Sequence, residues 1–186
     1  MKTIKVKDLM VPLEEYATVP VDASLFDAVM ALEKAQEELD RTRHHYLHRA
    51  VLVLDKEKKV IGKISQMDAI KGLEPKYRDM GDPHALSKAG FSADFLRSML
   101  QQYSLWDQPL SDLCRKASEI RVVDFMHTPA EGEYIREESS LEEAIHLLVA
   151  GRYHSLLVTR GNDIIGILKL TDVFNEIFQR MKTCNL

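Results

Sequence analysis

Hydrophobic positions along the chain follow a helical spacing in two separate places. Apolar residues recur every three or four positions after Ser24 and again after Ser140, which predicts two amphipathic helices. An acidic residue follows each serine by three positions, Asp27 in the first case and Glu143 in the second. A hydroxyl followed by such an acid can satisfy the free N–H groups of a helix start. Both helices are therefore expected to begin at these serines.

Each predicted helix is followed by two short apolar runs separated by a turn, which is the pattern of paired strands. The four runs are residues 50–54, 60–64, 155–159 and 164–168. A further helix is expected to begin near Asp68 after the first pair of strands and near Asp172 after the second. The two halves of the chain thus predict the same order of elements.

The two segments are copies of one another. An offset of 116 residues superposes Val6 on Val122 and Ser24 on Ser140 without a gap, and an offset of 104 places Asp68 on Asp172. One such unit is too small to cover both faces of its sheet, so the copies should pack against each other. We expect an α/β fold of two β-α-β-β-α repeats related by pseudo-twofold symmetry, with a helical insert between them.

The insert divides the chain into three parts. We expect the first repeat at 1–75, the insert at 76–120 and the second repeat at 121–186. Ser92 can cap a first insert helix, and a second helix is expected over 109–118. The apolar face of the first helix, predicted to be buried, comprises Phe95, Leu96, Met99, Leu100 and Tyr103. The predicted buried stripe of the second comprises Leu110, Leu113, Cys114 and Ala117.

Composition excludes several classes of protein. The 29% of charged residues mixes both signs around a net charge of −4, without the basic excess of a nucleic-acid-binding surface. The two cysteines, Cys114 and Cys184, are far apart, which favours a reducing compartment. No apolar run is long enough for a signal peptide or a membrane span. The sequence therefore predicts a cytoplasmic protein with no membrane partner.

The motifs of both repeats resemble the cystathionine β-synthase (CBS) domain. In the first repeat they read HRAVLVLD and VIGKISQMDAI, and in the second YHSLLV and IIGILKLTDVF. The resemblance covers roughly two-thirds of the chain and omits the insert. It implies a CBS pair, or Bateman module, with two symmetry-related clefts that bind AMP, ADP, ATP or S-adenosylmethionine. It also implies a regulatory role, a homodimer and a protein target that the sequence does not identify.

The family's ribose-binding signature is matched in the first repeat by Gly62, Ser65 and Asp68. A carboxylate can accept hydrogen bonds from both ribose hydroxyls, and helix N-terminal amides favour an anion. The resemblance implies that each cleft combines residues of both repeats. The Asp68 cleft would be completed by His127, Thr128, Glu133, Tyr134, Ile135, His154, Ser155 and Leu156. The other cleft would combine Lys169, Thr171 and Asp172 with Val11, Pro12, Ala17, Thr18, Val19, Arg49, Ala50 and Val51.

The second repeat departs from the signature, because Lys169 stands where the first has Ser65. A lysine there could hold a phosphate or simply fill the cleft, so the two sites should not be equivalent. By its motif the Asp68 site is the better nucleotide candidate. Arg49 and Lys169 would favour a polyphosphate near Asp172 if that site binds anything.

Structural explanations compete with these assignments. Ser65 and Asp68 also match a capping box, which many helix starts carry without a ligand. Gly62 and Gly166 are equally compatible with close packing between strands.

Three histidines raise the question of a metal site. Residues four apart share a helix face, so His44, His45 and His48 are candidates, but no third ligand with fitting spacing accompanies them. A solvated, polar helix end is the favoured interpretation, and no metal is expected.

The sequence contains no pattern of a catalytic site. G-x-S-x-G, H-E-x-x-H and P-loop motifs are absent, as is a cysteine–histidine arrangement. The protein is therefore not expected to be an enzyme. The alternative to a nucleotide sensor is an oligomerisation or partner-docking module whose clefts are vestigial.

Overall fold

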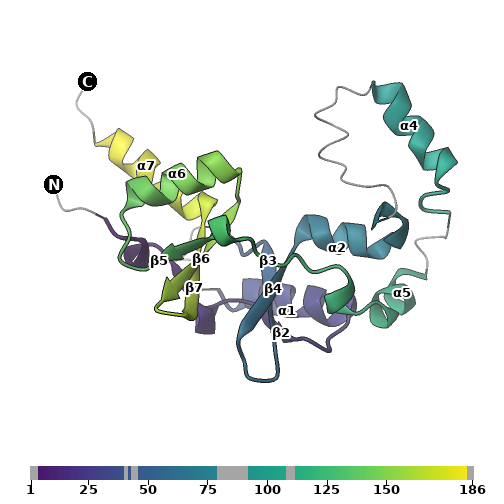
Figure 1. Cartoon of the computed structure of the whole chain (residues 1–186), viewed down its shortest axis with the longest axis horizontal. Helices are drawn as coiled ribbons and strands as arrows, with labels where there is room; N and C mark the ends of the chain where they lie inside the picture. Colours follow the sequence, from purple (N-terminus) through teal and green to yellow (C-terminus); the bar gives the residue numbers. More distant parts are fainter. Residues whose placement is uncertain (1–3, 40–41, 43–45, 79–91, 108–111, 184–186) are drawn as a thin grey trace.

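The structure is a computed structural model that describes residues 4–39, 42, 46–78, 92–107 and 112–183. It contains two small sheets with helices packed around them (Figure 1). Helix α1 (Leu25–Glu37) begins at Ser24, whose hydroxyl accepts the N–H of Asp27 at 3.1 Å. Helix α6 (Leu141–Gly151) begins in the same way at Ser140. Both predicted helix starts are confirmed.

The sheet of the first repeat has three strands in the order β2-β3-β4. They are β2 (Thr18–Pro20), β3 (Ala50–Leu54) and β4 (Val60–Ser65). Strand β2 runs parallel to β3, and β4 is antiparallel to β3. The two apolar runs predicted here are therefore neighbouring strands, and β4 extends one residue further than expected.

The second sheet has four strands, because it takes one from the N-terminal segment. Its order is β1-β7-β6-β5. The strands are β1 (Val11–Pro12), β5 (Tyr134–Arg136), β6 (Ser155–Arg160) and β7 (Asp163–Lys169). Strand β1 pairs antiparallel with β7, with Val11 opposite Ile167. A strand near the start of the first repeat thus completes the sheet of the second.

The remaining elements also occur in corresponding pairs. Helix α2 (Gln66–Leu73) follows β4, and α7 (Leu170–Lys182) follows β7. The short 3-10 turns are η1 (Val6–Asp8), η2 (Leu13–Glu15), η3 (Pro75–Arg78), η5 (Val122–Asp124) and η6 (Glu131–Glu133). Except for η3, each of these turns has its counterpart in the other half of the chain. The repeat layout agrees with the predicted α/β duplication.

The segment that leads into each repeat packs in the other repeat. The N–H of Val6 donates to the carbonyl of Ser139 at 3.0 Å, and the N–H of Val122 donates to that of Ala23 at 3.0 Å. Val6 is fully buried in the core of the second repeat, and Val122 is fully buried in the core of the first. The two halves therefore exchange their leading segments.

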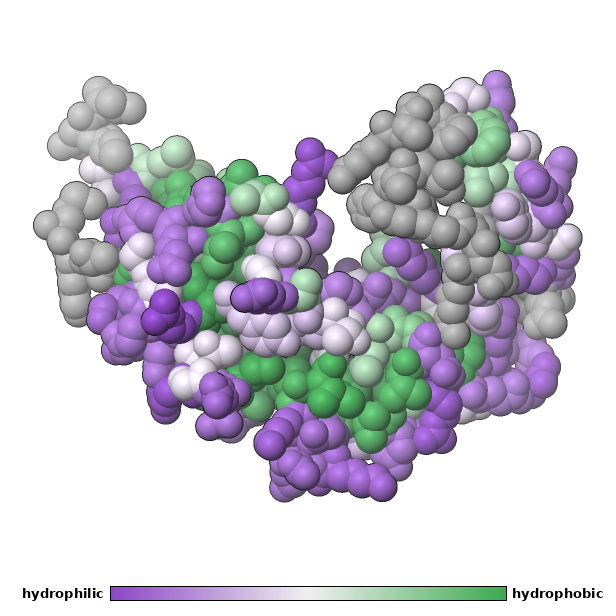
Figure 2. All heavy atoms as spheres, viewed as in Figure 1, coloured by the Kyte–Doolittle hydropathy of each residue, from purple (hydrophilic) through white to green (hydrophobic). Residues whose placement is uncertain are grey.

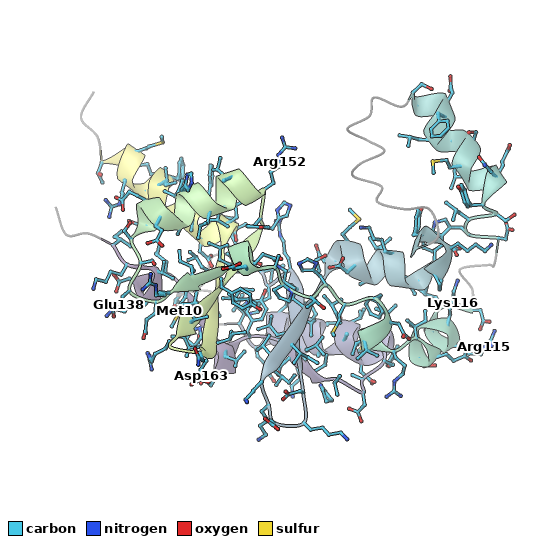
Figure 3. The ribbon with its side chains drawn as sticks, in the orientation of Figure 1. Met10, Arg115, Lys116, Glu138, Arg152 and Asp163 are labelled. Carbon is cyan, nitrogen blue, oxygen red and sulfur yellow. The ribbon has the colours of Figure 1, made fainter. Side chains whose placement is uncertain are left out.

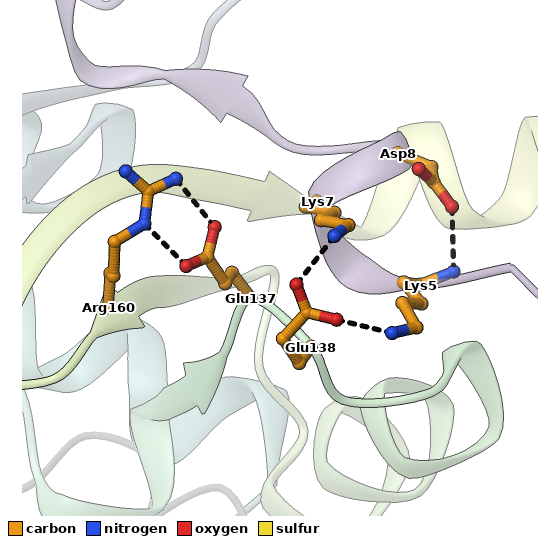
Figure 4. A network of polar contacts seen from close by, with 6 residues as sticks. All are labelled: Lys5, Lys7, Asp8, Glu137, Glu138 and Arg160. Carbon is orange, nitrogen blue, oxygen red and sulfur yellow. Dashed lines mark hydrogen bonds and ion pairs between the residues drawn. The ribbon is translucent and has the colours of Figure 1, made fainter.

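Ion pairs hold the exchanged N-terminal segment on the surface of the second repeat (Figure 4). Glu138 accepts hydrogen bonds from the ammonium groups of Lys5 and Lys7. These bonds lower the pKa of Glu138 to about 2. Beside them, Arg160 donates to Glu137 with its Nη2 at 2.7 Å. The side chains of Lys5, Lys7 and Glu138 are exposed, so their ion pairs add little stability compared with the burial of Val6.

A third apolar cluster joins the two repeats. It contains buried residues from both, namely Val11, Tyr16, Leu52, Leu157 and Ile167. The central strands β3 and β6 each contribute one leucine to it. Packing across this junction explains why the two copies form one body, because neither sheet covers its own apolar face.

The predicted burial of the first insert helix is wrong. Helix α4 (Ala93–Gln102) begins at Ser92 as expected, and Met99 is buried. Three other residues of its apolar face, Phe95, Leu96 and Leu100, are 38%, 45% and 46% exposed, and Tyr103 is half-buried. The physical reason is position, since α4 lies away from both sheets (Figure 1).

The second insert helix, α5 (Leu113–Glu119), packs against α1 and α2 of the first repeat. Residues 109–111 of the predicted range lie outside the described part of the chain, and so does Leu110 of the predicted stripe. Of that stripe Ala117 is buried, whereas Leu113 and Cys114 are exposed. The helix therefore contacts its neighbours with a narrower face than predicted. Cys184 also lies outside the described residues.

Candidate ligand sites at the junction of the two repeats

Ser65 and Asp68 form a complete capping box at the start of α2. The hydroxyl of Ser65 accepts the N–H of Asp68 at 3.1 Å. Oδ2 of Asp68 accepts the N–H of Ser65 at 2.9 Å and its hydroxyl at 2.6 Å. The described residues place no donor on Oδ1 of Asp68, so one carboxylate oxygen is left for another partner. The cap is real, and it is compatible with a ligand.

The second repeat contacts the first close to this site, at Lys63 of β4, two residues before Ser65. The N–H of Lys63 donates to the carbonyl of His127 at 3.0 Å, and the N–H of His127 donates back at 2.9 Å. Gly62 permits this approach, because a Cβ there would lie 2.5 Å from Sδ of Met126. Close packing therefore explains this glycine. The surface is hollowed beside the second repeat, in the region of α2 (Figure 2).

A buried carboxylate links the two repeats beside this contact. Glu133 is 2% exposed, bonds to the ammonium group of Lys63, and lies 2.5 Å from Nε2 of His127. Burial by itself would raise the pKa of Glu133. The hydrogen bonds from Lys63, His127 and the Ala130 N–H outweigh burial and leave the pKa below its ordinary value. The carboxylate is thus held in its charged form.

Sequence reasoning placed Glu133 only among the residues lining the Asp68 cleft. The offset of 116 aligns it with Ala17, an apolar residue in the first repeat. An acid in one copy at a position that is apolar in the other was the signal available in the sequence.

The other residues predicted for the Asp68 site differ in accessibility. Thr128 and His154 are exposed, and Ser155 is half-buried. Ile135 is 3% exposed in the core of the second repeat, so its side chain is unavailable to a ligand. Within η6, a Cβ on Gly132 would meet the ring of Tyr153, whose hydroxyl oxygen would lie 3.0 Å away.

At the equivalent place in the second repeat, Lys169 occupies the start of α7. Its side chain forms no cap; Nζ lies 3.2 Å from Oδ2 of Asp172 and donates to the carbonyl of Tyr46 at 2.8 Å. Lys169 is only 5% exposed. Burial lowers the pKa of Lys169, and the charge of Asp172 opposes that shift. A residue of the second repeat thereby binds both its own aspartate and the first repeat.

A buried tyrosine of the first repeat, Tyr16, lies close enough to Asp172 to be affected by its charge. Tyr16 and His48 pack with their ring centroids 4.4 Å apart. Burial raises the pKa of Tyr16 well above its ordinary value, and the charge of Asp172 adds to the shift. The backbone N–H groups of Ala50 and Arg49 bond to the Tyr16 oxygen and act in the opposite direction. Of the residues that lie here, Arg49 and Ala50 were predicted for the Asp172 site, whereas Tyr16 and His48 were not.

The expected environment of the histidines is wrong for His48. That residue is fully buried and precedes β3, whereas α1 ends at Glu37, so it does not lie on a solvated helix end. His44 and His45 lie outside the described residues. The part of the chain that the structure describes contains no group of three potential metal ligands.

The remaining predicted residues of this site mostly serve the fold. The side chains of Ala17 and Val19 lie in the first core, and Thr18 pairs with Leu52 across β2 and β3. Thr171 is half-buried in α7, while Arg49 is exposed. Gly166 lies against β1, since a Cβ there would be 2.5 Å from the carbonyl oxygen of Val11. Ala17 and Val19 could therefore contact a ligand only through their backbone atoms, because their side chains are buried.

The fold and the duplicated strand–helix motif define a protein of two like α/β units that share one junction. The sequence pattern of the CBS domain matches residues 6–75 and 122–179. This chain belongs to the CBS domain family and contains a tandem pair of these domains.

Solved structures with the same fold include a CBS-pair protein. CBSX2 from Arabidopsis thaliana is 18% identical with a TM-score of 0.58, over 98% of this chain and 100% of that one. A structure of CBSX2 in complex with AMP is 20% identical with a TM-score of 0.57, over 94% and 97%. A putative acetoin utilization protein (AcuB) from Vibrio cholerae is 18% identical with a TM-score of 0.58, over 97% and 95%. At these identities the likeness shows the fold alone.

Two further findings are negative. No curated protein sequence matches the chain significantly. Among the described residues no helix has the length and apolar character needed to cross a bilayer.

Proposed function

We propose that this protein is a regulatory module that binds an adenine nucleotide beside Asp68, and that it is not an enzyme. The observation that carries the proposal is the Asp68 carboxylate, held by Ser65 at the start of α2 with Oδ1 left as an acceptor. Two ribose hydroxyls can donate to such a carboxylate. The AMP complex of CBSX2, which has the same fold, supports this choice of ligand.

The second repeat would supply the remaining contacts. Thr128 and His154 are exposed and belong to the segments that the family resemblance assigns to this site. Arg152, two residues before His154, ends α6 with a left-handed backbone and points away from the ribbon (Figure 3). Its guanidinium is free to approach a phosphate group. A nucleotide contacting both repeats would favour one relative packing of them, which a protein partner could then recognise.

The first test is a titration of the purified protein with AMP, ADP, ATP and S-adenosylmethionine, followed by calorimetry and thermal unfolding. A ligand at about 100 times its dissociation constant stabilises a protein by about 2.7 kcal/mol. For a chain of this size the midpoint should rise by about 5–10 °C. The proposal is wrong if none of the four ligands binds.

The chain offers a matched control for the site. Asp27 makes the same three hydrogen bonds with Ser24, at 2.9, 2.7 and 3.1 Å, as Asp68 makes with Ser65. Asp68→Ala and Asp27→Ala should therefore lose similar helix-cap stability. Only Asp68→Ala should lose affinity for the nucleotide; equal affinities in the two variants would place the ligand elsewhere.

Exposed apolar faces on α2 and α7 favour a second role, assembly with another copy of the chain. Ile70 and Phe174 are aligned by the offset of 104 and are 53% and 62% exposed. Further exposed apolar residues on these helices are Met67, Phe178 and Met181. Like faces related by pseudo-symmetry suit the self-complementary interface of a homodimer. Sedimentation should show dimers that Ile70→Asp with Phe174→Asp converts to monomers; a monomeric parent protein contradicts this role.

A further inference from the structure

The two candidate sites differ in what fills them. Lys169 replaces Ser65 at the start of the second helix, and its side chain is buried. The offset of 116 aligns Tyr16 with Gly132, whose neighbouring space is taken by the ring of Tyr153 instead. The lysine is therefore the difference that adds atoms beside Asp172.

We propose that Lys169 is a built-in occupant of the Asp172 site, which restricts the module to one nucleotide per chain. This inference rests on the proposed function of the Asp68 site. The ammonium group of Lys169 takes the place that ribose hydroxyls would have on Asp172.

The contacts of Lys169 make it hard for a nucleotide to displace. Its Nζ lies 3.2 Å from Oδ2 of Asp172, and this ion pair is little screened by solvent because Lys169 is only 5% exposed. A ribose offers only neutral hydroxyls to the same oxygen. Displacement would also remove the donor to the carbonyl of Tyr46, which Lys169 reaches at 2.8 Å. A nucleotide would thus exchange stronger contacts for weaker ones.

Lys169 also performs the bridging that a ligand would otherwise perform. Lys169 and Asp172 belong to the second repeat, whereas Tyr46 precedes the first strand pair of the first repeat. The bond between Lys169 and Tyr46 therefore joins the repeats without any ligand. On the Asp68 side the Ser65 hydroxyl bonds only within its own helix start, and the link between the repeats is made by Lys63 and Glu133 instead. The residue that follows the strand therefore bridges the repeats only at Asp172, where it also occupies the aspartate.

The test is the stoichiometry of AMP binding by calorimetry, measured on the intact chain. The parent protein should bind one AMP, Asp68→Ala should abolish binding, and Asp172→Ala should leave affinity and stoichiometry unchanged. Lys169→Ser, which restores the serine of the first repeat, should bind a second AMP that Asp172→Ala then removes. Lys169→Ala removes the ammonium group without adding a cap and should also bind a second AMP. It keeps the test valid if Lys169→Ser folds poorly.

Three results would overturn the inference. The parent protein could bind two AMP molecules, one of them lost in Asp172→Ala. Lys169→Ser and Lys169→Ala could both be folded and still bind one. The Lys169 variants could bind ATP more weakly than the parent protein does, which would make the lysine a phosphate ligand. If the parent protein binds no AMP, the proposed function is wrong. In that case AMP binding by Lys169→Ser at Asp172 would still support the inference. No binding by either protein would contradict the proposed function and the inference together.

Discussion

Val6 and Val122 occupy equivalent places in each other's repeat. Val6 packs in the second core with Ile135 and Leu156, and Val122 packs in the first core with Val51 and Val53. Both valines are fully buried. The stability of each half therefore depends on a residue that the sequence assigns to the other half.

Val6→Ala should destabilise the second repeat, although Val6 lies in the segment leading into the first. Removing two methyl groups from a fully buried site costs about 2 kcal/mol. Hydrogen exchange should accelerate in β5, β6 and β7 more than in β2, β3 and β4. Val122→Ala is the matched control and should give the reverse distribution. Faster exchange of the first sheet in Val6→Ala would contradict the exchange of segments.

Gly166→Ala should be more damaging than Gly62→Ala. At position 166 a Cβ meets the backbone carbonyl of Val11 at 2.5 Å, which can move only if β1 moves. At position 62 it meets the thioether of Met126 at the same distance, and a methionine side chain can rotate away. We expect a loss of about 2–3 kcal/mol for Gly166→Ala and about 1 kcal/mol for Gly62→Ala, measured by urea unfolding. Equal losses would contradict this difference, because the β1 backbone at Val11 would then adjust as easily as the Met126 side chain.

Glu133→Gln should weaken the link between the repeats in a pH-dependent way. The folded pKa of Glu133 is lowered, so its carboxylate stabilises the fold above its ordinary pKa of 4.5, and this contribution is lost as the pH falls through the folded pKa. We expect a loss of about 2 kcal/mol at pH 7, because Lys63 keeps its charge in a largely buried place. The difference from the parent protein should shrink below pH 4.5. Glu131→Gln, on the exposed part of the same turn, serves as control and should show neither effect.

Glu74→Ala should release the end of α4 without unfolding the repeats. The buried carboxylate of Glu74 accepts the N–H of Trp106 at 2.7 Å, and the indole donates to the Tyr77 hydroxyl at 3.2 Å. Trp106 is the only tryptophan, so its fluorescence reports this contact alone. The emission should shift to the red, with a local loss of about 1–3 kcal/mol. Tyr77→Phe, which keeps the Glu74 bond, should shift the emission less; an unchanged spectrum in Glu74→Ala would contradict the anchoring role.

Local features of the fold could be predicted because local chemistry decides them. Ser24, Ser92 and Ser140 each accept the N–H three residues ahead, and that bond depends on nothing outside the first helical turn. The strands could also be predicted, because turn residues mark both ends of their apolar runs. The exposure of α4 could not be predicted, since periodicity identifies an apolar face but does not say whether another element covers it.

The arrangement of the site depended on contacts that a repeat pattern does not contain. The offset that aligns Val6 with Val122 is the same whether each segment packs on its own repeat or on the other one. Lys63 and Glu133 are 70 positions apart, and nothing in either local sequence pairs them. The sequence shows the difference between Ser65 and Lys169. It does not show that the lysine donates to the carbonyl of Tyr46.

The crossing of the leading segments separates the unit that was copied from the unit that folds. Each globular half contains a core valine and a backbone pairing from the other copy. Neither half could complete its apolar core without the segment that the other copy contributes. The connection between the two copies is therefore part of what completes each core.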